Sequence, residues 1–223
     1  MSLKVLVIGS EGQIGTELCS ELEKRNDIIL YRADIRIQTD RERRLYCLDA
    51  TDKGSVEQLI KEHQINEVYL MAALLSAKGE ENPSLAWHLN MNSLLHLLDI
   101  ARQGRFQKLF WPSSIAVFGP DSPKVTTPQN CVINPTTVYG ISKRSGEFWC
   151  DYYFRKYGVD VRSIRFPGLI SHATEPGGGT TDYSVAMIKE AVSKGKYTCY
   201  LKSDTILPML FMSDAVKATL AIM

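Results

Sequence analysis

The 223-residue sequence has no apolar run long enough to cross a lipid bilayer, and its formal net charge is only +1. The first absence excludes a membrane-spanning segment. The second leaves no strong charge field that would favour nucleic acid or a charged membrane surface. There is also no internal repeat and no low-complexity tract. With 44% hydrophobic residues, the composition is that of a globular chain with one substantial core.

Cysteine and histidine are sparse and scattered. The five cysteines form no Cys-x-x-Cys pair, and the four histidines are isolated from one another. Scattered thiols fit a reducing compartment, and no metal-ligand spacing is present. The chain also enters a strand-like run at once, without a basic leader. We therefore expect a cytoplasmic protein without a catalytic metal.

The first apolar run breaks into a glycine-rich turn. From Lys4 to Gly15 the sequence is KVLVIGSEGQIG, with glycines spaced Gly-x-x-Gly-x-x-Gly. The dinucleotide-binding fingerprint is Gly-x-Gly-x-x-Gly, one residue shorter in the first gap. Such glycines permit a sharp turn, close approach of a pyrophosphate and tight packing of a helix whose N-terminus attracts negative charge. The predicted phosphate contacts are Gly9, Gly12, Gln13, Ile14 and Gly15.

Asp34 ends the next apolar run, nineteen residues after Gly15. An acidic side chain here accepts hydrogen bonds from a ribose diol and repels a 2′-phosphate. We therefore predict NAD rather than NADP, with Arg36 as a further cofactor contact. Because Arg32 and Arg36 flank the site, a 2′-phosphate is the open alternative. The remaining predicted cofactor contacts, which follow two further strands, are Asp49, Ala72 and Ala73.

Strand-like runs alternate with helical stretches along most of the chain. The strands are expected near residues 4–9, 28–33, 44–48, 67–72, 108–113 and 160–166. Alternation of this kind predicts an α/β fold with a doubly wound parallel sheet of the Rossmann type, because parallel strands need crossover helices. We place a dinucleotide-binding domain at residues 1–168 and the beginning of a smaller substrate lobe at residues 169–223.

Tyr139 precedes Lys143 by four residues in a predicted helix over 136–157, and Ser114 lies twenty-five residues upstream of the tyrosine. Positions i and i+4 share one helix face, so both side chains can point at the same ligand and the bound cofactor. A free tyrosine ionises near pH ~10, and the ammonium is expected to lower that pKa toward the working range. Ser114 would hold the reacting oxygen. These three residues are the predicted catalytic set.

A second pair with the same spacing, Tyr152 and Lys156, occurs later in the same helical stretch. It lies thirteen residues further on, or about 20 Å along a helix, so the two pairs cannot serve one site. Ligands bind at the carboxyl ends of the strands in open α/β sheets, and a helix opened by Pro135 should begin at that edge. This favours Tyr139 and predicts that Tyr152 is packed or solvated elsewhere.

The helical stretches 84–102 and 136–157 carry apolar side chains around much of their circumference. One sheet face covers only part of such a surface. We expect the two helices to pair across a two-fold axis in a homodimer, with internal packing of the same helices as the alternative.

The chain resembles the extended short-chain dehydrogenases in its glycine turn, in Asp34 and in the set Ser114, Tyr139 and Lys143. This group includes sugar-nucleotide epimerases and dehydratases. The resemblance spans roughly residues 3–170. Finer motifs are similar to the short-chain L-threonine 3-dehydrogenases, namely AALLSA at 72–77, PTTVYG at 135–140, RFPG at 165–168 and PGGGTTDY at 176–183. Epimerases usually carry an asparagine-containing segment at the place of residues 167–168.

The resemblance implies NAD-dependent oxidation of the L-threonine hydroxyl to 2-amino-3-ketobutyrate, with Tyr139 as the base, Ser114 orienting the oxygen and Lys143 holding the nicotinamide ribose. A sugar-nucleotide epimerase or dehydratase and a non-catalytic NAD sensor are the alternatives. Relatives extend beyond Met223, so we expect an incomplete substrate lobe and leave the activity of the shortened chain open. Groups able to bind a small zwitterion are Ser76, Gly178, Thr180 and Thr181.

Overall fold

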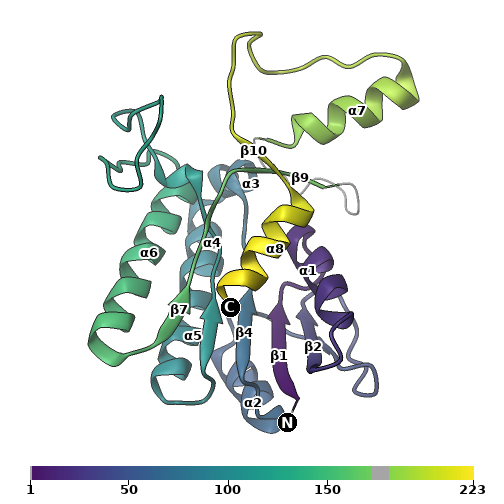
Figure 1. Cartoon of the computed structure of the whole chain (residues 1–223), viewed down its shortest axis with the longest axis vertical. Coiled ribbons are helices and arrows are strands. Elements are labelled where there is room, and N and C mark those ends of the chain that lie inside the picture. Colours follow the sequence, from purple (N-terminus) through teal and green to yellow (C-terminus); the bar gives the residue numbers. More distant parts are fainter. Residues whose placement is uncertain (1, 172–180) are drawn as a thin grey trace.

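A six-stranded parallel sheet forms the centre of the computed structural model, which describes residues 2–171 and 181–223 (Figure 1). Its strand order is β3-β2-β1-β4-β5-β7. The strands are β1 Leu3–Ile8, β2 Ile28–Asp34, β3 Leu45–Cys47, β4 Glu67–Leu70, β5 Lys108–Phe110 and β7 Asp160–Arg162. The doubly wound fold is confirmed, and each of the six expected strand regions contributes a strand to the sheet.

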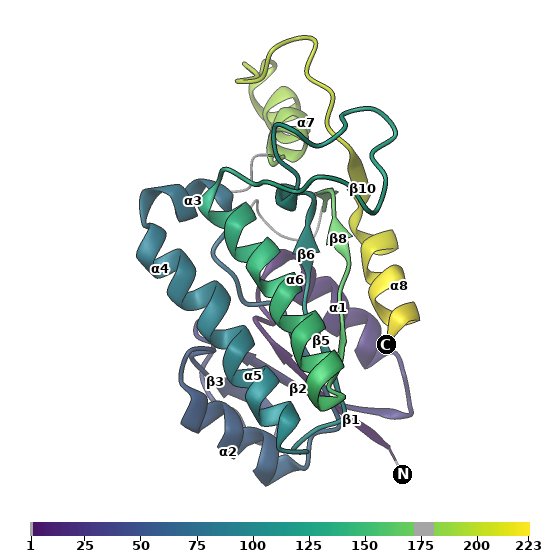
Figure 2. The same ribbon diagram turned by 90° about the vertical axis from the view of Figure 1, so that its left-hand side faces the viewer.

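Helices cover both faces of this sheet (Figures 1 and 2). One face packs against α2 Lys53–His63, α5 Ser93–Arg102 and α6 Val138–Tyr157. The other packs against α1 Gln13–Glu23 and α8 Met212–Ile222. No helix within the described ranges is sufficiently long and apolar to traverse a bilayer.

Strand β1 shows why its sequence is almost continuously apolar. Val5 and Val7 belong to the core beneath α1, whereas Leu6 and Ile8 belong to the core beneath α5. All four are at most 1% exposed. Burial on both faces is the property that distinguishes a parallel-sheet strand from the alternating pattern of a half-exposed one.

Several expected elements are divided in the structure. The helical stretch 84–102 consists of α4 Pro83–Trp87, a π-helical turn His88–Asn92 and α5. The expected strand 108–113 divides at Pro112, which has no N–H for a ladder hydrogen bond, into β5 and the short β6 Ser113–Ser114. Strand β6 pairs with β8 Arg165–Phe166 in a separate two-stranded sheet. This places Ser114 beyond the edge of the main sheet.

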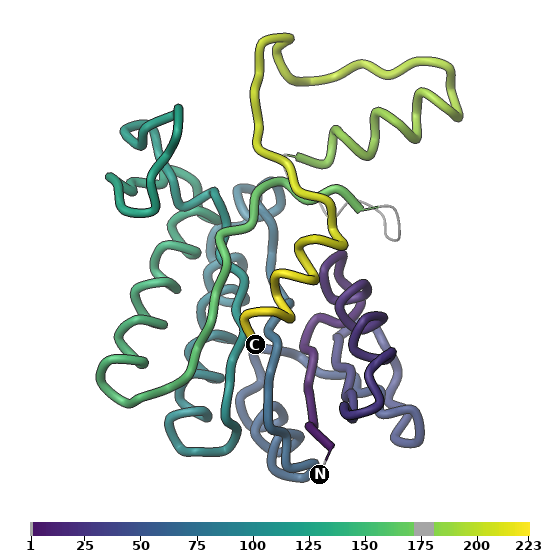
Figure 3. The backbone as a smooth tube through the Cα atoms, in the orientation of Figure 1, coloured from purple at the N-terminus to yellow at the C-terminus, as the bar shows by residue number. Residues whose placement is uncertain are grey.

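After residue 168 the chain runs beyond the end of the main sheet, and α8 then returns to pack on one face of that sheet (Figure 3). Strand β9 Gly168–Ile170 pairs with β10 Met209–Phe211, and α7 Tyr183–Lys194 lies away from the sheet. Helix α8 then packs its Ala215 and Val216 into the same core as Leu18 of α1. The domain boundary between residues 168 and 169 stays a prediction.

Gly15 lets α1 lie directly on the turn that precedes it. A Cβ at this position would be 2.1 Å from the carbonyl oxygen of Gly9, which is a backbone atom and cannot rotate away. We expect Gly15→Ala to lower the free energy of unfolding by roughly 1–3 kcal/mol, measured by urea denaturation.

Gly54 in α2 is the matched control for this substitution. The nearest atom to a Cβ there is the side-chain Oδ1 of Asp52 at 3.5 Å, so Gly54→Ala should leave stability unchanged or raise it by up to about 1 kcal/mol. Equal stabilities for the two variants would contradict the tight contact at Gly15.

Candidate active site

A cavity of about 810 Å³ runs along the carboxyl ends of the sheet strands. Its lining includes every described residue that the sequence analysis named for the site. These are Gly9, Gly12, Gln13, Ile14, Gly15, Asp34, Arg36, Asp49, Ala72, Ala73, Ser76, Ser114, Tyr139, Lys143 and Thr181. The expected contacts Gly178 and Thr180 lie outside the described residues. The structure therefore gathers the described residues of the set at one cavity, while their individual roles remain predictions.

The glycine turn leaves the start of α1 open to the cavity. Gly12 is the N-cap of this helix and has no side chain to bond its first amides. The nearest atom to a Cβ added at Gly12 is the carbonyl oxygen of Gly9 at 3.3 Å, and Gly12 itself lines the cavity. Free helix N-terminal amides beside open space fit the pyrophosphate of a dinucleotide.

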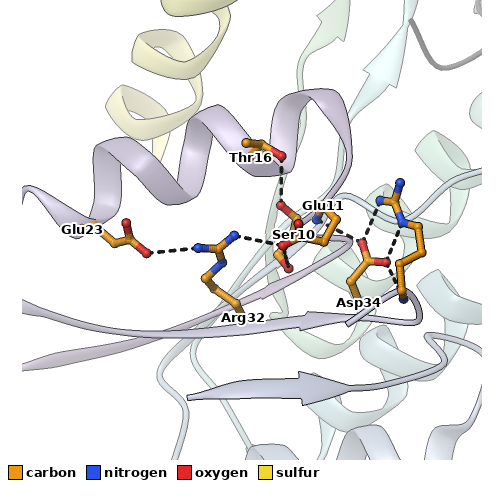
Figure 4. Close-up of polar contacts among 7 residues, drawn as sticks. Ser10, Glu11, Thr16, Glu23, Arg32 and Asp34 are labelled. Atoms are coloured by element: carbon orange, nitrogen blue, oxygen red, sulfur yellow. Dashed lines mark hydrogen bonds and ion pairs between the residues drawn. The ribbon is translucent and has the colours of Figure 1, made fainter. Parts of the chain in front are cut away.

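Asp34 stands at the end of β2 with its side chain only 5% exposed (Figure 4). Its carboxylate accepts hydrogen bonds from the backbone N–H of Glu11 and from the backbone and guanidinium of Arg36. Burial alone would raise the pKa of Asp34, but these hydrogen bonds outweigh it and hold that pKa below its ordinary value. The group is an acceptor of the kind that a ribose hydroxyl needs.

Tyr139 lies in the first turn of α6, as the sequence predicts. Thr137 caps this helix by accepting a hydrogen bond from the Gly140 amide at 3.0 Å. A Cβ on Gly140 would be 2.2 Å from the carbonyl oxygen of Ala116, so glycine lets the helix start against the segment that carries Ser114. The Ser114 side chain lies next to the phenol of Tyr139 and acts to lower its pKa.

Lys143 lies one turn further along α6 and is 2% exposed. Its Nζ donates a 2.6 Å hydrogen bond to the carbonyl oxygen of Pro112. The same ammonium lies 4.4 Å from the ring centroid of Trp111 and 5.4 Å from that of Tyr139. The lysine therefore meets the face of the tyrosine ring and binds the chain just before Ser114.

The prediction that the Lys143 ammonium lowers the pKa of Tyr139 is wrong in this structure. Burial raises the pKa of Tyr139 to about 12, with the Ser114 side chain opposing it. Burial also lowers the pKa of Lys143 from 10.5 to about 7. Removal from water thus dominates both groups and outweighs the attraction expected between ammonium and phenolate.

The second pair occupies the outside of the molecule. Lys156 donates a 2.7 Å hydrogen bond to the hydroxyl of Tyr152, which is 41% exposed. Neither residue lines the cavity. The structure thus places Tyr139 and Lys143 at the cavity and the second pair outside it, and the catalytic role of Tyr139 and Lys143 stays a prediction.

Asn90 is a buried polar residue that the sequence analysis missed. Its side chain accepts a hydrogen bond from the Leu74 amide at 2.8 Å and donates one to the Leu74 carbonyl at 3.0 Å. The same amide nitrogen contacts Ser142 in α6 at 3.4 Å. It fixes the segment after β4 against the helix of Tyr139. The available signal was a pair of asparagines, Asn90 and Asn92, within an apolar helical run.

A second missed group is centred on Glu147, one turn beyond Lys143. This carboxylate accepts hydrogen bonds from Ser113, Arg144 and Arg165 at 2.7 to 2.9 Å. Burial would raise the pKa of Glu147, but these donors hold it below its ordinary value. The network ties α6 to both strands of the small sheet, next to Ser114.

The family model described as "NAD dependent epimerase/dehydratase family" matches residues 5–223. The chain belongs to this family. An uncharacterized epimerase/dehydratase of Staphylococcus saprophyticus is 45% identical over 227 aligned residues, which cover 99% of this chain and 70% of that protein.

Solved structures give a narrower likeness. The chain is 52% identical to a partial consensus L-threonine 3-dehydrogenase, with a TM-score of 0.92 over 99% of this chain and 72% of the other. It is 50% identical to the GalE-like L-threonine dehydrogenase of Cupriavidus necator in its holo form, with a TM-score of 0.93 over 98% and 72% of the two chains. The resemblance to epimerase-like L-threonine 3-dehydrogenases is thereby confirmed.

Two further structures bear on the alternatives. A monomeric L-threonine 3-dehydrogenase from a metagenome is 47% identical, with a TM-score of 0.91 over 98% of this chain and 71% of the other. A UDP-glucose 4-epimerase of Thermotoga maritima is 22% identical, with a TM-score of 0.87 over 99% and 73%. At that identity the epimerase shows a shared fold alone.

The buried Lys143 predicts a pH dependence of stability. Because its folded pKa of about 7 lies below the unfolded value of 10.5, the unfolded chain holds more protons between these limits. The free energy of unfolding should therefore gain a contribution as pH rises from about 7 to about 10. Lys143→Met should remove that contribution, seen in urea denaturation across this range.

Lys156→Met is the control on the same helix. Its ammonium is solvent-exposed, and the hydrogen bond to Tyr152 raises the pKa of Lys156 instead of lowering it. This variant should keep the wild-type gain in stability above pH ~7. Loss of the gain in the control, or its persistence in Lys143→Met, would refute the assignment.

Proposed function

We propose that the chain oxidises the 3-hydroxyl of L-threonine to 2-amino-3-ketobutyrate with NAD as the cofactor. The observation that carries this proposal is the single cavity lined by the glycine turn, Asp34 and the set Ser114, Tyr139 and Lys143. A dinucleotide site joined to a proton-transfer site is the arrangement that alcohol oxidation requires. The likeness to L-threonine dehydrogenases supports the choice of substrate.

The cofactor would be held by residues that already face the cavity. Free amides at the start of α1 suit its pyrophosphate, and Asp34 suits the adenosine ribose. Asp49, Ala72 and Ala73 line the cavity after β3 and β4, where small side chains let a ligand approach the backbone. When bound, NAD supplies the acceptor of the hydride that leaves the substrate carbon.

The chain's own residues would manage the proton. The phenolate form of Tyr139 accepts it from the substrate alcohol and becomes the phenol as the carbon–oxygen bond gains double-bond character. Ser114, whose side chain lies next to the phenol, donates to the substrate oxygen and fixes its direction. The Nζ of Lys143 lies 5.4 Å from the centroid of the tyrosine ring, so the ammonium form of this lysine would stabilise a phenolate there.

The substrate end of the cavity is lined by Ser76 and Thr181, whose hydroxyls suit the carboxylate or ammonium of a small zwitterion. Pro167 and Gly168 also line it, at the place where epimerases usually carry asparagine. A sugar-nucleotide epimerase or dehydratase remains the second enzymatic candidate because the family contains both activities. Retention of both Tyr139 and Lys143 argues against a non-catalytic NAD sensor.

The activity can be tested by following NADH absorbance in the full chain supplied with NAD and L-threonine. We expect NADH to form with L-threonine and not with UDP-glucose. Tyr139→Phe should lower turnover by at least about 10²-fold, because it removes the proton acceptor. Its affinity for NAD, measured by calorimetry, should stay within about twofold of wild type because the pyrophosphate and ribose contacts remain.

Tyr152→Phe is the matched control, since it removes the same hydroxyl from the second pair outside the cavity. It should retain wild-type turnover. Near-normal activity of Tyr139→Phe would show that the base is misassigned. Formation of the C4 epimer of UDP-glucose, without NADH from L-threonine, would favour the epimerase, because epimerisation returns the hydride and leaves no net NADH.

The predicted homodimer belongs to the same proposal. The outer faces of α4 and α6 lie side by side in Figure 2 and carry large exposed aromatic side chains. Phe148 and Phe154 are 59% and 60% exposed, and Trp87 and Trp149 are exposed as well. An apolar surface of this kind favours a self-complementary contact between two copies.

Light scattering at micromolar concentration should give twice the chain mass of 25.1 kDa. Phe154→Glu should dissociate the dimer, because it puts a carboxylate into the apolar contact and no cationic side chain lies three or four residues away on its own helix. Val192→Glu on α7 adds the same charge at an exposed apolar position away from this face and should remain dimeric. A monomeric wild-type chain would contradict the dimer.

A further inference from the structure

The carboxylate of Asp34 has its hydrogen-bonding positions filled by the chain itself (Figure 4). Oδ1 accepts from the backbone N–H of Arg36 at 3.0 Å and from Arg36 Nε at 2.9 Å. Oδ2 accepts from the backbone N–H of Glu11 at 3.0 Å and from Arg36 Nη2 at 3.0 Å. An ionised carboxylate offers about four acceptor positions, so a ribose hydroxyl finds none free beside these partners.

The four partners divide into two kinds. Each oxygen of Asp34 receives one backbone N–H, which belongs to the local fold and orients the carboxylate. Each oxygen also receives one guanidinium N–H from the same side chain, Arg36. The guanidinium is thus a two-pronged donor on the two oxygens, which is the pattern that the vicinal hydroxyls of a ribose would present.

Arg36 is the partner able to leave. Its side chain is 58% exposed, whereas that of Asp34 is 5% exposed. Departure of the guanidinium would free one position on each oxygen and leave both backbone hydrogen bonds in place. Water readily solvates a half-exposed arginine, so breaking its ion pair with Asp34 costs little free energy. The hydrogen bonds from a bound diol would replace those from the guanidinium.

We propose that Arg36 is a specificity-determining residue that caps Asp34: its guanidinium occupies the place of the ribose diol, leaves when NAD binds, and is the group that would pair with a 2′-phosphate. The inference rests on the proposed function, which takes a dinucleotide to be the cofactor. It changes the role of Arg36 from a simple cofactor contact to a competitor of NAD.

The neighbouring Arg32 does not act as the cap on Asp34, because its guanidinium is already paired with two other carboxylates. Its guanidinium contacts Glu11 at 2.9 Å and Glu23 at 3.3 Å, and its side chain is 26% exposed (Figure 4). The three carboxylates of this cluster outnumber its two guanidinium groups by one. A 2′-phosphate would therefore be repelled unless Arg36 turned from Asp34 to meet it.

The test compares the full wild-type chain with Arg36→Ala by calorimetric titration with NAD and with NADP at one low salt concentration. Removing the competitor should tighten NAD binding by about three- to tenfold, the range expected for a partly exposed ion pair. Removing the phosphate partner should raise the ratio of the NADP to the NAD dissociation constant by at least about tenfold. Arg36→Lys, with a charge but no fork, should fall between the two proteins.

Arg41→Ala is the control, because Arg41 pairs with Glu62 at 2.7 Å and does not line the cavity. It should bind NAD as wild type does. If Arg36→Ala binds NAD equally well or less well than wild type, the cap is refuted while the dinucleotide site stands. If folded wild-type and Arg36→Ala chains bind neither dinucleotide, the proposed cofactor and the cap both fail.

Discussion

The arrangement of the site depends on a buried ammonium, that of Lys143, which bonds the carbonyl oxygen of Pro112. This contact joins α6 to the segment between β5 and β6, and so sets the distance between the helix of Tyr139 and the strand of Ser114. A charge removed from water needs such partners, and the face of Trp111 supplies a second one. Gly146 lets that ring lie close, since a Cβ there would be 2.3 Å from it.

The same contact explains why the environment of the tyrosine is drier than the spacing rule suggests. To bring Lys143 and Tyr139 together at the end of the sheet, the chain packs α6 tightly against β6 and the turn that follows. Tight packing buries Lys143 and encloses one side of the half-buried Tyr139, and burial lowers the pKa of the lysine and raises that of the tyrosine. The close packing that places Lys143 beside Tyr139 therefore opposes the lowered tyrosine pKa that the same pair was expected to produce.

Sequence patterns predicted the regular alternation of strands and helices in this structure. Apolar runs predicted the six strands. The glycine turn and Asp34 lie at strand ends, where the fold brings them together. Hydrogen bonds between residues far apart in the sequence were not predictable in this way. Asn90 reaches Leu74 and Ser142, which are sixteen and fifty-two residues away in sequence. The local sequence marks Asn90 as a polar residue in an apolar run but does not identify its partners, and the desolvation of Lys143 likewise depends on the packing of the whole fold.

The two ends of the cavity share a physical property. At one end Lys143 is bonded to a carbonyl oxygen, and at the other Asp34 is bonded to Arg36 and to backbone amides. Polar groups with little access to water require partners, and the chain provides them from within. A ligand that uses these groups must exchange one set of hydrogen bonds for another. The free energy of binding is then a difference between two partner sets, so a residue that lines the cavity can oppose the ligand as readily as it can bind it.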